Sequence, residues 1–237
     1  MPPARPGLSR LIAPVLFLIT APSGAGKTTV SRNLLERTPG LVRAITCTTR
    51  PPRGNERDGV DYHFLSSEIF EARVAAGQFL EHAQVYANRY GTLKSEVLSR
   101  LAAGNDVLLS VDVQGAAAIR AMAGRDPALA QSLVTAFIMP PSYAELERRL
   151  RGRGEDAPEV VATRLAAARA EMETWRQCDY LIVSGTEQED FDAMQRILAV
   201  ERLKTVRTRT LRLDGHAFEP ALHPAPAPTH AAHDHAS

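Results

Sequence analysis

Short apolar runs alternate along the chain with longer segments in which apolar residues recur every three or four positions. Runs typical of buried parallel strands span residues 15–19, 42–46, 107–111, 133–138 and 180–183. Segments with helical spacing lie at 27–37, 68–76, 94–103, 115–122, 143–151, 157–176 and 190–204. Strands that alternate with helices predict an α/β domain whose parallel sheet is covered by helices on both faces.

One stretch interrupts this alternation. Between Cys47 and Tyr90 the chain is polar, punctuated by glycine and proline, and poor in core residues. This pattern predicts an inserted subdomain of about residues 46–98. Further along, Asp156 and Glu159 have the spacing of a capping box, so a helix is predicted to begin near Ala157.

The two ends of the chain differ in composition from the middle. Residues 1–13 begin with three prolines and are predicted to form a flexible extension. Residues 209–237 are rich in proline, alanine and histidine, cannot pack a core, and are predicted to be a disordered tail. A single folded domain is therefore expected over residues 14–208.

The apolar run near the start has two interpretations. It follows Arg5 and Arg10 and precedes small residues, as in a secretory signal. We favour a buried strand, because cleavage after the small residues would remove the phosphate-binding motif described below. No apolar run approaches the roughly 20 residues that a membrane span needs. The protein is expected to be cytoplasmic and to make no membrane contact.

Composition excludes several classes of function. The 237 residues carry 28 Lys and Arg against 27 Asp and Glu, a formal net charge of +1, which gives no global basic field for nucleic acid or a membrane surface. Aromatic residues are 5% of the chain, too few for a platform that stacks single-stranded nucleic acid. The two cysteines are expected to be reduced thiols.

The strongest motif follows the first predicted strand. Residues 21–28, APSGAGKT, fit the pattern G-x-x-x-x-G-K-[ST] except at the first position, where alanine requires a turn with negative φ. Such a loop directs backbone N–H groups at phosphate oxygens. Lys27 would bridge the β- and γ-phosphates, and Thr28 would give its hydroxyl to Mg²⁺. The predicted nucleotide-binding residues are Ala21, Pro22, Ser23, Gly24, Ala25, Gly26, Lys27, Thr28 and Thr29.

A second set of residues suits a nucleoside monophosphate. Arg50 and Arg53, three apart on a proline-stiffened loop, could fork onto one phosphate, and Tyr62 and Tyr90 could add hydroxyl donors. Glu81 could accept the adjacent N1–H and N2–H₂ donors of guanine, whereas adenine presents an acceptor at N1 and would be repelled. Taken singly, the arginines also suit solvated loop charges, and the tyrosines ordinary half-buried aromatics.

Several segments together resemble guanylate kinases in order and spacing, from about residue 15 to residue 207. Besides APSGAGK they are TTRPPR at 48–53, DY at 61–62, FLEHA at 79–83, NRYGT at 88–92, DVQG at 112–115 and RLRGRG at 149–154. The resemblance implies a P-loop NTPase three-layer fold with a five-stranded parallel sheet, a GMP-binding insert at about 46–98 and a helical lid at about 149–165. It also implies transfer of the γ-phosphoryl group of ATP to GMP or dGMP, with Mg²⁺, giving ADP and GDP or dGDP.

The resemblance assigns roles to particular residues. Thr46, Thr92 and Asp112 would complete the guanine pocket around Glu81, and Arg50, Arg53, Tyr62 and Tyr90 would hold the phosphate. The implied catalytic residues are Lys27, Arg149, Arg153 and Arg164, whereas Arg148 and Arg151 are expected to be solvated, and Gly152 and Gly154 to let the lid hinge.

The chain departs from the family pattern in several places. Thr46 and Thr92 stand where serines are common, which keeps the hydroxyl. Ser110 stands where an acid is usual, which puts one Mg²⁺-linked or pocket contact in doubt. Ser184-Gly185-Thr186 stands where an Asn-Asp pair is usual, so contacts with adenine are expected to run through the backbone.

Two other functions stay open at this point. One is a P-loop kinase for a different nucleoside monophosphate. The other is a non-catalytic guanylate kinase-like module that binds a protein partner, against which the chain retains Lys27, Thr28, Arg149 and Arg153. The sequence leaves the oligomeric state open, a homo-oligomer included.

Overall fold

The computed structural model of the chain describes residues 8–85, 87–152 and 158–218. Residues 13–207 belong to one compact unit, and the described residues on either side of it belong to a second. No described helix is long and apolar enough to cross a membrane.

The centre of the larger unit is a parallel sheet. Over the described residues it has five strands in the order β10-β9-β2-β8-β3, and every neighbouring pair is parallel. This confirms the predicted α/β fold class. The strands are β2 (Leu16–Thr20), β3 (Leu41–Arg43), β8 (Asp106–Ser110), β9 (Leu133–Met139) and β10 (Tyr180–Val183).

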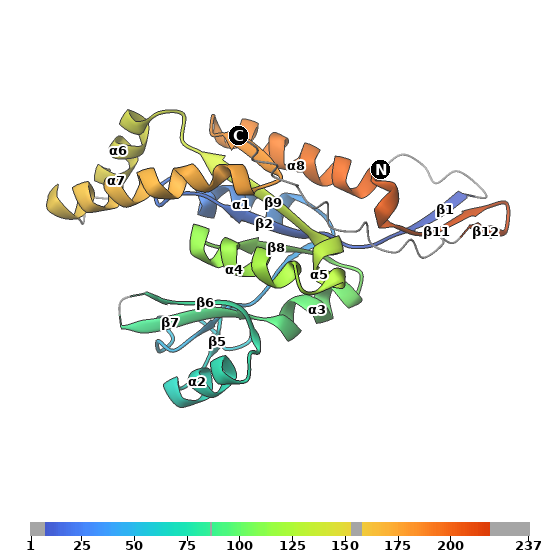
Figure 1. Ribbon diagram of the computed structural model, residues 1–237, viewed down its shortest axis with the longest axis horizontal. Helices are drawn as coiled ribbons and strands as arrows, with labels where there is room; N and C mark the ends of the chain where they lie inside the picture. The colour runs from blue at the N-terminus through green and yellow to red at the C-terminus, as the bar shows by residue number, and fades with distance from the viewer. Residues whose placement is uncertain (1–7, 86, 153–157, 219–237) are drawn as a thin grey trace, which may run out of the picture. The chain divides into compact units, whose positions relative to one another are not determined.

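Alternate side chains of the first apolar run enter two separate cores. Val15, Phe17 and Ile19 pack on one face of the sheet with residues of α1 and α8, and Leu16 and Leu18 pack on the other face with α3, α4 and α5 (Figure 1). A strand buried on both faces explains why the run has no polar alternation. The helices are α1 (Lys27–Arg37), α3 (Lys94–Ala102), α4 (Val113–Ala123), α5 (Pro127–Ser132) and α8 (Glu187–Leu203).

Two details of these elements differ from the sequence prediction. The predicted strand at 42–46 ends at Arg43, because the N–H of Ile45 donates to the Glu96 carboxylate of α3 at 2.9 Å and the chain leaves the sheet. Helix α5 was not predicted. It is six residues long, and it begins where the Asp126 side chain accepts the N–H groups of Ala128 and Leu129.

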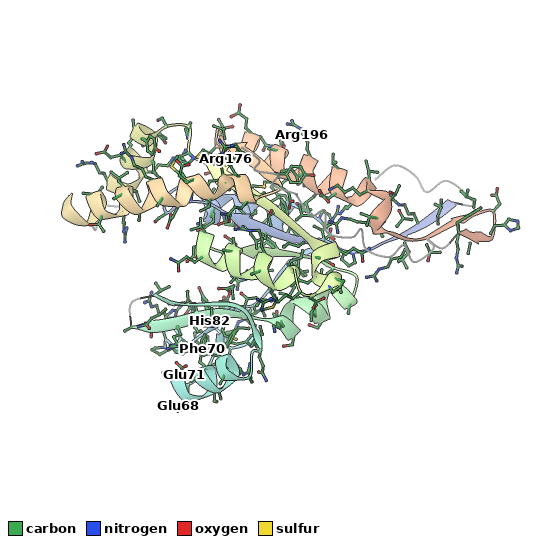
Figure 2. All side chains as sticks on the ribbon, in the orientation of Figure 1. Glu68, Phe70, Glu71, His82, Arg176 and Arg196 are labelled. Carbon is green, nitrogen blue, oxygen red and sulfur yellow. The ribbon has the colours of Figure 1, made fainter. Side chains whose placement is uncertain are left out.

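The stretch predicted to be an inserted subdomain folds around its own sheet. The strand order is β5-β4-β7-β6, and Cys47, Phe70, Phe79 and Leu93 form a small core beneath it. Phe70 and His82 lie together there with their rings edge to face (Figure 2). The elements of this insert are β4 (Cys47–Thr48), β5 (His63–Phe64), α2 (Ser67–Ala75), β6 (Phe79–Val85) and β7 (Asn88–Leu93).

The segment predicted to form a lid belongs to a pair of helices, α6 (Tyr143–Arg151) and α7 (Pro158–Met172). Leu146 and Leu150 of α6 pack against Ala168 and Met172 of α7. Gly152 ends α6 with a helical backbone and a φ of −69°. Arg153, Gly154 and Asp156 lie outside the described residues, and so does most of the connection between the two helices. The 3₁₀ helix η1 (Glu173–Gln177) follows α7, and η2 (Thr205–Arg207) follows α8.

The predicted flexible extension and disordered tail need correction in part. Strand β1 (Leu8–Ile12) pairs antiparallel with β11 (Thr208–Leu213), which forms a hairpin with β12 (His216–Phe218). Asp214 and Gly215 form the turn with φ of 48° and 87°, a sequence suited to tight hairpins. Arg10 Nε donates to Thr208 Oγ1 at 2.7 Å, which adds a side-chain contact to the pairing. Residues 1–7 and 219–237 lie outside the described residues.

Candidate active site

The predicted phosphate-binding loop connects β2 to α1. Gly24 and Gly26 have φ of 88° and 101°, values that side chains disfavour, and they let the backbone turn sharply before the helix begins at Lys27. Among the described non-glycine residues Asp214 alone has positive φ, so Ala21 fits the turn as expected. Lys27 Nζ donates to the carbonyl oxygen of Ala21 at 2.8 Å, across the mouth of the loop.

Helix α6 lies directly against this loop. A β-carbon at Gly24 would lie 3.0 Å from Leu150 Cδ2 and 3.3 Å from Leu146 Cδ1. Arg149 Nη1 donates to the Ala25 carbonyl at 3.4 Å, and its Nε donates to Glu145 at 2.7 Å. One predicted catalytic arginine therefore contacts the phosphate-binding loop.

The other predicted arginines of this region are placed differently. Arg164 lies on α7 and is half-buried. Arg148 and Arg151 are exposed, and they pair with Glu145 and Glu147 on the surface of α6. Arg153 lies outside the described residues.

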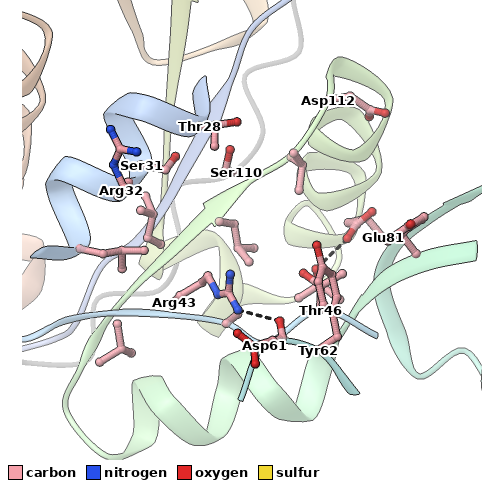
Figure 3. A pocket seen from close by; sticks show the side chains of 18 of the residues that line it. Thr28, Ser31, Arg32, Arg43, Thr46, Asp61, Tyr62, Glu81, Ser110 and Asp112 are labelled. Atoms are coloured by element: carbon pink, nitrogen blue, oxygen red, sulfur yellow. Dashed lines mark hydrogen bonds between the residues drawn. The ribbon is translucent and has the colours of Figure 1, made fainter. Parts of the chain in front are cut away.

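A cleft of about 930 Å³ joins the start of α1 to the insert (Figure 3). Thr28 and Ser110 lie at one end of it, and Thr46, Tyr62 and Glu81 at the other. The predicted residues that line it are Thr28, Thr46, Tyr62, Glu81, Tyr90, Thr92 and Asp112. The other predicted residues that the structure describes are not in its lining: residues 21–27, Thr29, Arg50, Arg53, Arg149 and Arg164.

Two carboxylates meet where the insert faces α4. Glu81 Oε1 accepts the Thr92 hydroxyl at 2.7 Å, and Asp112 Oδ1 accepts the N–H of Gly115 as the N-terminal cap of α4. A β-carbon at Gly115 would lie 3.4 Å from an oxygen of each, so glycine makes room for both. Burial raises the pKa of Glu81 above its ordinary value, and the neighbouring Asp112 adds to the rise.

Arg50 is held from several sides in the wall of the insert. Its side chain is 7% exposed, and both terminal nitrogens donate to Glu56, at 2.6 and 2.7 Å. The guanidinium lies 4.9 Å from the centre of the Tyr62 ring, and a hydrogen bond joins it to Tyr90. The predicted phosphate residues Arg50, Tyr62 and Tyr90 are thus together, whereas the Arg53 side chain is exposed on the loop beside them.

Oxygen donors at the α1 end of the cleft are few. Thr28, Ser31 and Ser110 contribute hydroxyls there, and Asp112 already caps α4. Within the ranges that the structure describes, no cluster of three or more His, Cys, Asp or Glu side chains could hold a metal ion. This donor set suits a Mg²⁺ ion that is held mainly by nucleotide phosphates and water, and it does not suit a permanent metal cage.

The segment expected near adenine is engaged within the protein. The Ser184 hydroxyl and the Gly185 N–H both donate to the buried carboxylate of Asp190, at 2.8 and 2.9 Å. Thr186 caps α8 in a reciprocal pair with Glu189. Backbone contact with adenine through this segment stays a prediction.

Three carboxylates of the site were not predicted. Glu145 could have been found, because it precedes Arg149 by four residues on one helix face. Glu56 contacts Arg50 across a loop, and Glu171 of α7 accepts the N–H of Ser23 at 3.2 Å across 148 residues of sequence. No local sequence pattern identifies a contact as distant in sequence as that between Glu171 and Ser23.

Together these features are those of a P-loop phosphotransferase with an inserted subdomain beside the loop. The loop follows the first strand of a parallel sheet and opens a helix, and the cleft beside it presents paired carboxylates and hydroxyls.

Comparisons with known proteins identify the family. The guanylate kinase family profile matches residues 14–201. A guanylate kinase of Sphingopyxis alaskensis is 45% identical over 203 residues, which cover 86% of this chain and 89% of that protein. One of Paramagnetospirillum magneticum is 46% identical over 193 residues, 81% of this chain and 87% of that protein. The chain belongs to the guanylate kinase family, which confirms the resemblance inferred from the motifs.

A solved structure agrees with this assignment. The crystal structure of guanylate kinase from Anaplasma phagocytophilum superposes with a TM-score of 0.65 at 31% identity, covering 84% of this chain and 92% of that one. The P-loop fold predicted from the motifs is confirmed by this likeness together with the strand order of the central sheet.

Proposed function

We propose that the chain transfers the γ-phosphoryl group of ATP to GMP or dGMP, giving ADP and GDP or dGDP, through the residues of the cleft and the adjoining loop. The observation that carries the proposal is the pairing of Glu81 with Thr92 beside Asp112, at the end of the cleft opposite Thr28. We expect the reaction to serve purine nucleotide metabolism in the cytoplasm.

Hydrogen-bond acceptors of the cleft would recognise guanine. Its N1–H and N2–H₂ groups are adjacent donors, and the Glu81 carboxylate can accept both. Thr92 holds one oxygen of that carboxylate at 2.7 Å, which fixes its direction in the cleft. Adenine would place an acceptor against the carboxylate and leave it unpaired, a loss larger than a missing hydrogen bond in water.

The phosphates would meet between the loop and the insert. ATP phosphates would lie over the loop that precedes α1, with Lys27 and Arg149 beside them, and the GMP phosphate would lie against Arg50, Arg53, Tyr62 and Tyr90. The acceptor needs no general base, because a phosphate monoester with a second pKa of about 6 is already ionised at neutral pH. The residues then act by alignment and by placing positive charge where the transferred group passes.

A divalent cation fits the donors at the α1 end. Thr28 would supply a hydroxyl to Mg²⁺, and Ser110 lies at the same end of the cleft. When bound, the ion would offset the negative charge of the nucleotide phosphates.

The test compares two neighbouring arginines of α6. Arg149→Ala should lower kcat by roughly 10²–10³-fold, because an arginine that stabilises the transferred group supplies a large part of catalysis. Arg148→Ala is the matched control, since Arg148 also pairs with Glu145 but is 72% exposed, and its kcat should stay within about twofold of the wild type. Equal effects of the two substitutions would contradict the role of Arg149.

The loop is tested in the same assay. Lys27→Ala should abolish nearly all ADP formation and leave the far-ultraviolet circular dichroism unchanged, because Lys27 is half-buried at the surface of the loop and not in a core. Near-normal turnover would remove Lys27 from the proposed mechanism.

A further inference from the structure

The loop between β4 and β5 contains a carboxylate that the proposed reaction does not use. Glu56 lies on a turn in which its own N–H donates to the Arg53 carbonyl at 3.0 Å, and Gly54 within that turn has φ of 53°. In return, Glu56 Oε2 accepts the N–H of Arg53 at 2.8 Å. The turn therefore fixes Glu56 to the backbone of one predicted phosphate-binding arginine.

The Glu56 carboxylate also holds the side chain of Arg50, the other predicted phosphate-binding arginine. Glu56 Oε2 accepts Arg50 Nη1 at 2.6 Å, and Oε1 accepts Nη2 at 2.7 Å, so the pair is bidentate. The remaining hydrogen of Nη1 is directed to the Pro51 carbonyl at 3.0 Å. The N–H of Nε and the second N–H of Nη2 form another edge of the planar group. Neither Glu56 nor Pro51 accepts a hydrogen bond from this edge.

We infer that Glu56 is a positioning residue for the GMP phosphate, which fixes the Arg50 guanidinium and the Arg53 backbone before the substrate binds. The inference rests on the proposed function, because it assumes that Arg50 contacts that phosphate. Held at its far end by Glu56, the guanidinium lies over the Tyr62 ring and is hydrogen-bonded to Tyr90, the two tyrosines predicted to contact the same phosphate. A group that is already oriented loses less conformational freedom when the substrate binds.

The charge of Glu56 has a second effect of opposite sign. A carboxylate near the site repels a phosphate, so removing it could strengthen binding. Orientation is the larger effect here, because the Arg50 side chain is 7% exposed and removal of Glu56 would leave a buried guanidinium without its partner. The Arg50 guanidinium lowers the pKa of Glu56 to about 2, so the pair persists at every pH used for an assay.

The experiment measures kcat, the KM for GMP, the KM for ATP and the calorimetric Kd for GMP. Glu56→Gln should raise the KM and Kd for GMP by about 10- to 100-fold, the range for a lost hydrogen bond to a charged group, with kcat within about twofold and the KM for ATP unchanged. The ratio of the KM for GMP in Glu56→Gln to that in the wild type should be constant from pH 5 to pH 8. Glu56→Asp, which keeps the charge on a shorter side chain, should raise the KM for GMP by a smaller factor, and it carries the test if Glu56→Gln does not fold.

A matched control lies on the same insert. Glu71 pairs with Arg89 at 2.8 Å, both side chains are more exposed than Glu56 and Arg50, and neither lines the cleft, so Glu71→Gln should leave all four quantities unchanged (Figure 2). An unchanged or lower KM for GMP in both Glu56 variants would overturn the inference, and so would an equal rise in Glu71→Gln or in the KM for ATP.

Arg50→Ala distinguishes the role of Glu56 from the existence of the phosphate site. A raised KM for GMP in Arg50→Ala, with no rise in the Glu56 variants, would reject the role of Glu56 and leave the phosphate site in place. An unchanged KM for GMP in Arg50→Ala would reject the phosphate site itself.

Discussion

Glu81 lies at a position that disfavours a charged side chain. Burial raises the pKa of its carboxyl, and Asp112 adds to the rise, whereas the Thr92 hydroxyl stabilises the ionised form. Two donors of guanine would compensate this carboxylate when GMP binds, and adenine would not. The same burial that disfavours the ionised form of Glu81 in the free protein would therefore make the residue selective for guanine.

The raised pKa predicts how GMP binding depends on pH. As pH falls, Glu81 should be protonated at a higher pH than an ordinary glutamate and lose one acceptor, so the KM for GMP should rise while the KM for ATP changes little. Glu81→Gln should raise the KM for GMP by about 10- to 100-fold at pH 7.5. The ratio of the KM for GMP of Glu81→Gln to that of the wild type should shrink toward low pH, because protonation removes one acceptor of Glu81 from the wild type as well. Titration of the GMP phosphate affects both proteins and cancels in this ratio. A ratio that does not change with pH would contradict a titrating Glu81.

Stability gives an independent check on the same residue. An acid whose pKa is higher in the folded state binds protons more tightly there, so its contribution to the free energy of unfolding falls as pH rises through the raised pKa. Glu81→Gln removes this loss and keeps an acceptor for Thr92. Its Tm should exceed that of the wild type at pH 8, and the difference should diminish toward pH 4. A lower Tm at pH 8 would show that ionised Glu81 does not destabilise the fold.

Residue types and spacing indicated candidates for this site but not the contacts that support them. Lys27, Thr28, Glu81 and Arg149 could be selected because each belongs to a motif whose chemistry is local. Glu171 could not, because it accepts the N–H of Ser23 only after α7 has packed against the loop.

Among the secondary-structure elements, the phosphate-binding loop and α6 can approach each other closely because Gly24 has no side chain. Gly24 has φ of 88°, and a β-carbon there would press on Leu150 and Leu146, which anchor α6 to α7. The position of Arg149, one residue before Leu150, follows from this contact. The loop and α6 are therefore expected to move together.

Gly24→Ala tests that coupling, and Gly40→Ala is its control. Both positions have positive φ, so each substitution should lower the free energy of unfolding by about 1–3 kcal/mol through backbone strain. A β-carbon at Gly40 meets no atom within 4 Å, so kcat should be unchanged in Gly40→Ala and at least about tenfold lower in Gly24→Ala. Equal kcat in the two variants would mean that α6 does not depend on the loop.

The elements themselves followed from the sequence where the apolar pattern was long. The parallel strands and most helices were predicted within a few residues, because two-sided burial leaves continuous apolar runs. Strands β1 and β11 were missed, since the prolines near one end and the histidines near the other masked a short alternating pattern. The Asp214-Gly215 turn was the signal that could have revealed the hairpin.

At the scale of the whole molecule, one buried polar cluster joins α8 to the central sheet of the larger unit. Glu201 of α8 and Arg207 of η2 are 1% and 3% exposed and pair with each other. Tyr180 of β10 donates to Glu201 at 2.6 Å, and Arg207 donates to the carbonyl of Gln131 on α5. Each buried group has a partner, so the cluster should stabilise the fold without entering the reaction.

Tyr180→Phe measures what this cluster contributes. It should lower the free energy of unfolding by about 1.5–3 kcal/mol, because a hydrogen bond to a buried carboxylate is lost, and it should leave kcat and both KM values unchanged. The hydrogen bond to Glu201 raises the pKa of Tyr180 to about 12, so the stabilisation should be complete below pH 10 and decline as pH rises toward 12. Tyr143→Phe, at an exposed tyrosine, should show neither effect, and similar losses in both variants would contradict this account.

We propose that this chain phosphorylates GMP because the cleft selects guanine. The most direct measurement is ADP formation from ATP with GMP, dGMP, AMP, CMP and UMP under identical conditions. We predict that GMP and dGMP are used and that kcat/KM for AMP is lower by about 10³-fold or more, since a buried carboxylate left unpaired rejects the wrong base strongly. Comparable kcat/KM values for GMP and any of AMP, CMP or UMP would contradict the claim.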